Sequence, residues 1–183
     1  MTCPNCDSSL NFPGRLIKVN KELNTCAICG EHLPSSIYKQ KWDSYFLGIC
    51  NAVAVNSPCL SRHIGAILVR DHSILSTGYN GPARGVPHCQ NICPRRAIGH
   101  SSGEGLDICP AQHAEENCIS NAARLGVSVA DSTLYMNFKI PCKNCLGTLI
   151  NAGVEEVVVK DVTVYDKYSS HLIHMIKIRP FEM

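Results

Sequence analysis

The sequence predicts an α/β protein, a layered αβα sandwich on a mixed sheet of five strands, with a small separate module in front. Two apolar runs, at 64–69 and 73–79, flank Arg70-Asp71-His72 and predict a β-hairpin. After Pro110, helical and strand-like patterns alternate, which predicts parallel strands joined by crossover helices. The module is indicated by closely paired cysteines near the N-terminus.

The elements are expected in the following order. An amphipathic helix covers about 41–55 and ends at Asn56-Ser57-Pro58. The hairpin follows, and then a long irregular loop runs to about Pro110. The remaining elements alternate, with helices expected at 113–125, 142–152 and 165–174 and strands at 133–138, 154–160 and 175–181.

Size and composition limit the function classes. The 183 residues allow one ordinary domain and a small module, and 45% hydrophobic residues support a packed core. A formal net charge of +2 argues against a surface that tracks a long phosphate backbone, but not against binding one nucleotide. No apolar run approaches the roughly 18 residues of a membrane span, and the N-terminus is not a secretory signal. We therefore expect a cytoplasmic protein without a membrane partner.

The twelve cysteines are better explained by metal binding than by disulfides, because most are closely spaced and no secretory signal precedes them. Cys3, Cys6, Cys26 and Cys29 have the spacing of a zinc site. So short a segment buries little apolar surface, and a bound metal would supply its folding energy. We predict a zinc ribbon over 1–36 and a second domain over 37–183. The ribbon could contact nucleic acid or protein, or only stabilise the chain or its oligomer.

The long loop before Pro110 needs something to hold it, because structureless loops of this length are uncommon in compact domains. It contains Cys89, Cys93 and Cys109, together with His88 and His100. A second structural zinc would hold it, and the alternative is a set of unpaired thiols.

A third set of metal-binding residues differs from the other two because it has an acidic neighbour. His113, Cys142 and Cys145 supply three ligands, which leave a tetrahedral zinc one open position for water. Glu115 faces another direction and is free to move protons beside that water. H-x-E followed by P-C-x-x-C is the pattern of zinc-dependent nucleobase deaminases. The alternative is a chance histidine, a surface glutamate and two core cysteines.

From Trp42 to Phe181 the chain resembles the deoxycytidylate deaminase family of the cytidine deaminase superfamily, with the zinc ribbon as an N-terminal extension. The motifs that carry the resemblance are Gly65-Ala66-Ile67-Leu68-Val69, Gly78-Tyr79-Asn80-Gly81, Pro87-His88-Cys89, His113-Ala114-Glu115-Glu116-Asn117, Pro141-Cys142-Lys143-Asn144-Cys145 and Ile150-Asn151-Ala152-Gly153. The resemblance implies a cytidine-deaminase-like fold and hydrolytic, zinc-dependent conversion of dCMP, or a close relative, to dUMP and ammonia.

The resemblance also implies roles for individual residues. His113, Cys142 and Cys145 would hold the catalytic zinc, and Glu115 would shuttle protons. Asn80 would bind a sugar hydroxyl, the Ala114 backbone N–H the pyrimidine carbonyl, and Arg62 or Arg84 a phosphate, although both arginines could equally be solvated surface charges. The loop zinc would be held by four residues drawn from Cys59, His88, Cys89, Cys93 and Cys109. Cys118 is expected to be a core thiol.

The resemblance also suggests partners, and other features of the sequence leave two alternative functions open. The family suggests a homo-oligomer with dCTP and dTTP as effectors. One alternative is a deaminase that acts on cytosine or adenine within RNA or DNA, which the ribbon suggests and the near-neutral charge opposes. Another is a non-catalytic member that binds nucleic acid or protein, which the intact Glu115 opposes.

Overall fold

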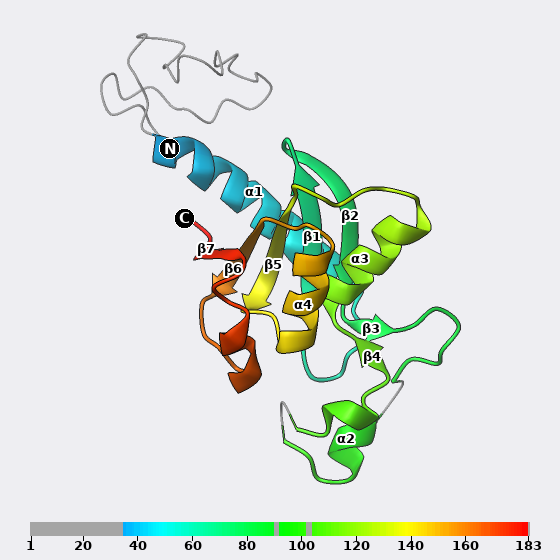
Figure 1. Cartoon of the computed structure of the whole chain (residues 1–183). Helices are drawn as coiled ribbons and strands as arrows, with labels where there is room; N and C mark the ends of the chain where they lie inside the picture. Colours follow the sequence, from blue (N-terminus) through cyan, green and yellow to red (C-terminus); the bar gives the residue numbers. More distant parts are fainter. Residues whose placement is uncertain (1–34, 90–91, 102–103, 183) are drawn as a thin grey trace, which may run out of the picture. The chain divides into compact units, whose positions relative to one another are not determined.

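The fold is described from a computed structural model of the chain, which describes residues 35–89, 92–101 and 104–182 (Figure 1). The predicted zinc ribbon, with Cys3, Cys6, Cys26 and Cys29, lies outside the described residues. The described residues fall into two units, one formed by residues 35–43 with Glu182 and the other by Ser44–Phe181. The second unit contains both sheets and the candidate site.

A mixed five-stranded sheet forms the centre of this unit, as predicted. Its strand order is β2-β1-β5-β6-β7. Strand β1 is antiparallel to β2 and β5, whereas β5, β6 and β7 are parallel to one another. The strands are β1 (Gly65–Arg70), β2 (Ser73–Tyr79), β5 (Thr133–Lys139), β6 (Glu156–Asp161) and β7 (Lys177–Pro180).

The predicted hairpin is confirmed, and its turn explains the register. Asp71 and His72 have φ values of 50° and 59°, and Arg70 pairs with Ser73 on either side of them. Two central residues with positive φ match the twist of antiparallel strands.

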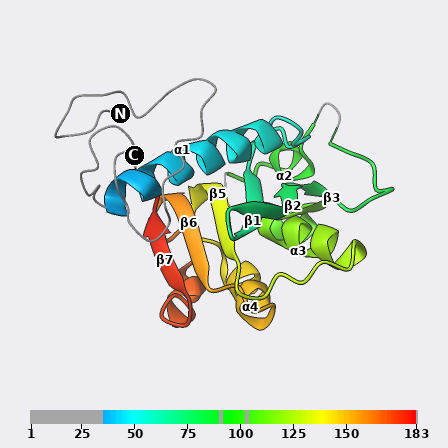
Figure 2. The same cartoon turned by 90° about the horizontal axis from the view of Figure 1, so that it is seen from above.

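Helices cover both faces of the sheet. Figure 2 shows the part of α1 (Ser35–Ala54) from Ser44 onward on one face, with α3 (Ala114–Arg124) and α4 (Lys143–Asn151) on the other. Two glycines allow the helices to approach closely. A Cβ at Gly65 would lie 2.1 Å from the Cys50 oxygen in α1, and one at Gly78 would lie 2.4 Å from the Ala114 oxygen in α3. The first turn of α3 is thus held directly against β2.

The core is apolar on both sides of the sheet. Phe46 of α1 contacts the Tyr135 ring at a centroid distance of 4.7 Å, and the Cys50 thiol donates to the Tyr135 carbonyl. On the other face, Cys118 is fully buried and donates to the Ala66 carbonyl, which confirms it as a core thiol. The buried cluster on that face is formed mainly by Ala66, Leu68, Ala114, Cys118, Ala122, Leu134, Met136, Leu146, Leu149, Val157 and Val159.

The loop that was expected to be irregular contains short elements. Strand β3 (Gly81–Pro82) pairs antiparallel with β4 (Ala111–Gln112), which joins the two ends of the loop. Between them lie α2 (Pro94–Ala97) and the 3₁₀ turn η1 (Leu106–Ile108). Two-residue strands carry no periodicity, so the sequence pattern could not indicate them.

The prediction of a helix at 165–174 was wrong. The structure has only the 3₁₀ turn η2 (Lys167–His171) there. The Ser169 hydroxyl donates to the Asp166 carbonyl and the Ser170 hydroxyl to the Lys167 carbonyl, both at 2.7 Å. Such local bonds compete with helical hydrogen bonding. Within the described part of the chain, no helix has the length and apolar character needed to cross a membrane.

Candidate active site

The structure brings His113, Cys142 and Cys145 together. The Nδ1 atom of His113 lies 3.5 Å from the Cys142 sulfur and 3.3 Å from the Cys145 sulfur, and the two sulfurs are 3.5 Å apart. Across the described residues, this is the one group of three or more His, Cys, Asp or Glu side chains whose ligand atoms all lie within 4.8 Å of one another.

Two helix N-termini position these ligands. His113 is the N-cap of α3, and its backbone N–H donates to the Glu116 carboxylate at 3.2 Å. Cys142 is the N-cap of α4, and Cys145 lies one turn further on. The Asp166 carboxylate accepts a hydrogen bond from the Lys143 N–H at 2.8 Å, which further fixes the start of α4. The positive ends of both helices favour thiolate over thiol.

The spacing of the three atoms fits zinc. Ideal tetrahedral coordination, with Zn–S and Zn–N distances of about 2.3 and 2.0 Å, separates two sulfurs by about 3.8 Å and a sulfur from a nitrogen by about 3.5 Å. The observed separations of 3.3–3.5 Å differ from these by a few tenths of an ångström. One imidazole and two sulfurs also match the borderline-soft character of zinc.

Without a metal, hydrogen bonds connect the three ligand side chains. The hydrogen bond with Cys145 lowers the pKa of Cys142 to about 4. The hydrogen bond with Cys142 raises the pKa of His113 to about 9, and the hydrogen bond with Cys142 together with burial raises the pKa of the Cys145 thiol. At neutral pH the metal-free site therefore holds a Cys142 thiolate beside two protonated ligands.

We predict that zinc binding at this site releases about two protons at pH 7, because His113 and Cys145 must each lose one to coordinate. The release can be measured by titration calorimetry of metal-free protein in buffers of different ionisation enthalpy. Cys145→Ser is the control, since it removes one ligand and leaves any other zinc site of the chain intact. A variant that releases as many protons as the wild type would contradict the prediction.

Glu115 lies beside the ligands but is not one of them. Its side chain is 3% exposed, and burial raises its pKa to about 7 even though the positive charge of His113 opposes the shift. A carboxylate with a pKa near neutrality can both accept and donate a proton at physiological pH. The fold thus places a buried carboxyl group with a pKa near neutrality next to three side chains that could hold a metal ion.

A pocket opens beside this triad. It is lined by His113, Ala114 and Glu115 and by aromatic, apolar and polar side chains. The other lining residues are Cys59, Ser61, Arg62, Ile64, Asn80, Arg95, Leu106, Cys109, Ala111, Gln112, Met136, Phe138 and Tyr165.

Asn80 holds one wall of the pocket through a hydrogen-bonded network. Its Oδ1 accepts from the Ile64 N–H at 2.8 Å and lies 2.7 Å from the Ser57 hydroxyl, while its Nδ2 donates to the Arg62 carbonyl at 2.9 Å. The Arg62 guanidinium lies over the Phe138 ring, 5.0 Å from its centroid. One N–H of the Asn80 amide is left for a ligand.

Arg62 and Arg84, the two phosphate candidates, occupy different places. Arg62 lines the pocket beside the triad. Arg84 donates to the Asn121 side chain at 2.8 Å and lines a separate pocket, together with Arg124. The structure therefore brings Arg62 and not Arg84 to the site.

The sequence patterns did not identify four side chains at this site. Three of them line the pocket, namely Arg95, Phe138 and Tyr165, and the fourth, Ser57, donates a hydrogen bond to Asn80. Ser57 ended a predicted helix, Phe138 ended a predicted strand and Tyr165 began a predicted helix. None of them stands in a spacing pattern with the metal ligands, so no local signal could have found them.

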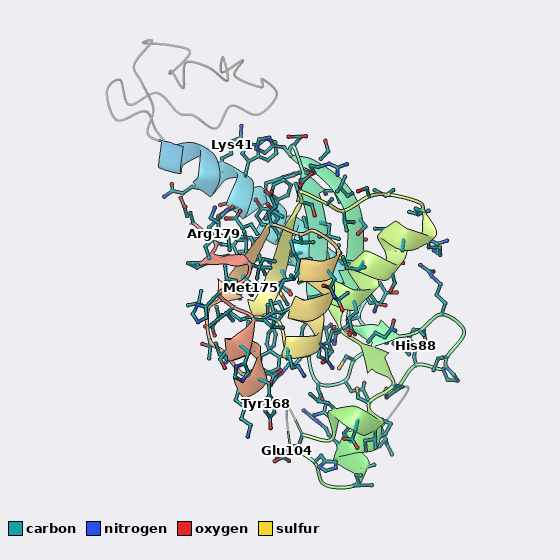
Figure 3. All side chains as sticks on the ribbon, in the orientation of Figure 1. Lys41, His88, Glu104, Tyr168, Met175 and Arg179 are labelled. Carbon is teal, nitrogen blue, oxygen red and sulfur yellow. The ribbon has the colours of Figure 1, made fainter. Side chains whose placement is uncertain are left out.

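The loop cysteines come near one another without forming a tight group. Burial and then the neighbouring thiols of Cys93, Cys109 and Cys59 raise the pKa of Cys89. His88, labelled in Figure 3, is exposed. Cys89 thus has the thiols of three other cysteines in its electrostatic surroundings.

One His and two Cys ligands at converging helix starts, with a buried glutamate beside them, are the arrangement by which zinc-dependent nucleobase deaminases bind metal and move protons. Residues 40–161 match the model of the family described as the cytidine and deoxycytidylate deaminase zinc-binding region. The chain belongs to this family.

Named relatives agree with this assignment. The chain is 35% identical over 137 residues to the deoxycytidylate deaminase of Schizosaccharomyces pombe, a match that covers 74% of this chain and 42% of the relative. It is 37% identical over 123 residues to that of Saccharomyces cerevisiae, covering 67% and 38%. The chain thus matches less than half the length of these two relatives.

A solved structure shows the same fold. The apo dCMP deaminase from the cyanophage S-TIM5 superimposes with a TM-score of 0.58 at 20% identity, covering 81% of this chain and 99% of that one.

Proposed function

We propose that the protein catalyses zinc-dependent hydrolytic deamination of dCMP, or a close relative of dCMP, to dUMP with release of ammonia. The observation that carries the proposal is the buried Glu115, whose pKa is raised to about 7, in the pocket lined by the metal ligand His113. The substrate is supported by the relatives named as deoxycytidylate deaminases.

The side chains present can perform the required proton transfers. Zinc, held by His113, Cys142 and Cys145, would supply the Lewis acidity that makes water nucleophilic at neutral pH. Glu115 accepts one proton from the attacking water and delivers it to the ring nitrogen, and then accepts the second proton from the hydroxyl added to C4 and delivers it to the departing amine. The C4–N bond is broken and a C4–O bond is formed, so that dCMP and water give dUMP and ammonia. Burial of Glu115 keeps bulk water from competing for these protons.

Three further groups are proposed to orient the nucleotide. The Ala114 N–H lies in the first turn of α3, where N–H groups have no partner within the helix, and it would donate to the pyrimidine carbonyl. The remaining N–H of Asn80 would donate to a sugar hydroxyl. Arg62, already packed on Phe138, would approach the phosphate.

Structural zinc sites are part of the same proposal. Cys59, Cys89, Cys93 and Cys109 would hold one ion, with His88 as the spare residue, and the effect of the other three thiols on the Cys89 pKa supports the set. Cys3, Cys6, Cys26 and Cys29 would hold another ion in a zinc ribbon over 1–36. Three zinc ions per chain are therefore expected by metal analysis.

Regulation and assembly are proposed from the family alone, with identical subunits and with dCTP and dTTP as effectors. The basic pocket that contains Arg84 and Arg124 is compatible with an anionic effector. Cytoplasmic location and a nucleic-acid contact by the ribbon are kept as hypotheses.

A substrate panel tests the proposed activity. Zinc-loaded protein is incubated with dCMP, CMP, deoxycytidine and a cytosine-containing oligonucleotide, and ammonia release is followed. We expect the highest kcat/KM with dCMP. Release only from the oligonucleotide would support a polynucleotide deaminase, and no release from any substrate would support a non-catalytic binding protein.

A further inference from the structure

Arg95 is a buried charge that the proposed chemistry does not use. It lies in the short helix α2 (Pro94–Ala97), within the loop between Cys89 and Cys109, and its exposure is only 8%. The next residue, Arg96, is exposed. Arginine is rarely buried without a partner for its charge, because desolvating a guanidinium is costly.

The partners of Arg95 within the protein are mainly neutral. Its Nε donates to the Glu104 carbonyl, and its Nη2 donates to the Ser101 carbonyl at 3.2 Å. The Glu104 carboxylate instead accepts a hydrogen bond from the Ser101 N–H at 2.8 Å. Glu104 is labelled in Figure 3. Within the part of the chain that the structure describes, no carboxylate forms an ion pair with Arg95.

One nearby group that can become anionic is the Cys93 thiol. Its pKa is lowered chiefly by the backbone N–H of Arg96, and the charge of Arg95 is a smaller cause. The guanidinium has five N–H donors, and two of them are used by the loop carbonyls. The planar guanidinium is held by two backbone carbonyls and has donors left over, so it is suited to bidentate binding of a phosphate.

Arg95 lines the same pocket as Glu115, Asn80 and Arg62. An anionic ligand that enters this pocket can therefore reach the guanidinium, whose hydrogen bonds within the protein go to neutral carbonyls. We propose that Arg95 binds the phosphate monoester of the nucleotide and makes the pocket select nucleotides over nucleosides. This inference rests on the proposed function, because it assigns one part of the substrate to one residue of the same pocket.

The test compares the zinc-loaded wild type with Arg95→Gln and with the matched control Arg96→Gln, which removes the same charge from the exposed neighbour. Loss of a charged hydrogen bond should lower kcat/KM for dCMP by about 10- to 100-fold in Arg95→Gln, mainly through KM. The kcat/KM for deoxycytidine should stay within about twofold, and Arg96→Gln should resemble the wild type with both substrates.

Equal losses with dCMP and deoxycytidine, or no loss with either, would overturn the assignment, since a merely structural arginine does not distinguish the two substrates. If Arg95→Gln fails to fold, Arg95→Lys keeps the charge but loses the fork. It should then show an intermediate loss confined to dCMP, and a loss shared with deoxycytidine would overturn the assignment.

A binding measurement separates this inference from the proposed activity. Titration calorimetry of zinc-loaded protein with dCMP and with deoxycytidine should show a preference for dCMP that Arg95→Gln abolishes and Arg96→Gln keeps. This result in a protein without turnover would refute the proposed function and retain the role of Arg95. If instead the protein turns over dCMP and Arg95→Gln leaves the binding preference unchanged, the proposed function is retained and the role of Arg95 is refuted.

Discussion

Glu115→Gln is expected to lower kcat for dCMP by about 10³-fold, within the range of 10²–10⁴ that general acid–base catalysis contributes. The amide keeps the shape of the side chain but cannot carry protons between water and the amine. Because Glu115 is not among the three metal ligands, the zinc content should not change. Steady-state kinetics together with metal analysis checks both expectations.

Glu155→Gln is the control for that substitution, because Glu155 is exposed and outside the pocket. It should have near-normal activity. A Glu115→Gln variant that keeps most of its rate would show that another group moves the protons. A variant that loses zinc would show that Glu115 supports the metal site rather than the reaction.

Glu115→Gln should also change how the stability of the metal-free protein depends on pH. Burial raises the pKa of Glu115 from its ordinary 4.5 to about 7, so the folded state binds this proton more tightly than the unfolded state. Between these two pH values the folded state therefore loses stability as pH rises, by roughly 3 kcal/mol in total. Glu115→Gln should remove this loss, and urea denaturation of both proteins at pH 5 and pH 8 would show it.

Gly78→Ala is expected to destabilise the fold by about 3 kcal/mol and to release the zinc that His113, Cys142 and Cys145 are proposed to hold. The added Cβ would lie 2.4 Å from both the Ala114 oxygen and the Cys118 nitrogen of α3. Backbone atoms cannot move aside as flexible side chains do, so the start of α3 must shift away from β2. Because His113 caps that helix, the shift would pull it away from Cys142 and Cys145.

Gly147→Ala is the matched control, since a Cβ there would meet only the Leu172 Cδ1 atom, at 3.9 Å. Alanine in the interior of α4 should instead stabilise the protein by about 0.5–1 kcal/mol. Denaturation curves and metal analysis of both variants provide the measurement. Equal stability of Gly78→Ala and wild type would mean that α3 does not pack on β2 as closely as described.

Local patterns were sufficient for most of the framework. The hairpin turn, the alternating strands and the glycines after 113–125 and 142–152 are features of neighbouring residues, and their elements formed within a few residues of the expected limits. The last predicted helix failed for an equally local reason, because Ser169 and Ser170 bond to nearby carbonyls. Strands β3 and β4 were missed because residues about thirty positions apart define them.

The match to the H-x-E and P-C-x-x-C pattern of zinc-dependent nucleobase deaminases identified His113, Cys142, Cys145 and Glu115 as one chemical set. The surroundings of that set depended on folding. Ser57 meets Asn80, and Arg95 reaches the pocket of Glu115, only through contacts between segments far apart in the sequence. Burial then gave these groups their properties, because it moved the Glu115 pKa towards neutrality and kept Arg95 from solvent. Apolar periodicity predicts which apolar residues are buried, but it did not indicate the burial of these two charged side chains.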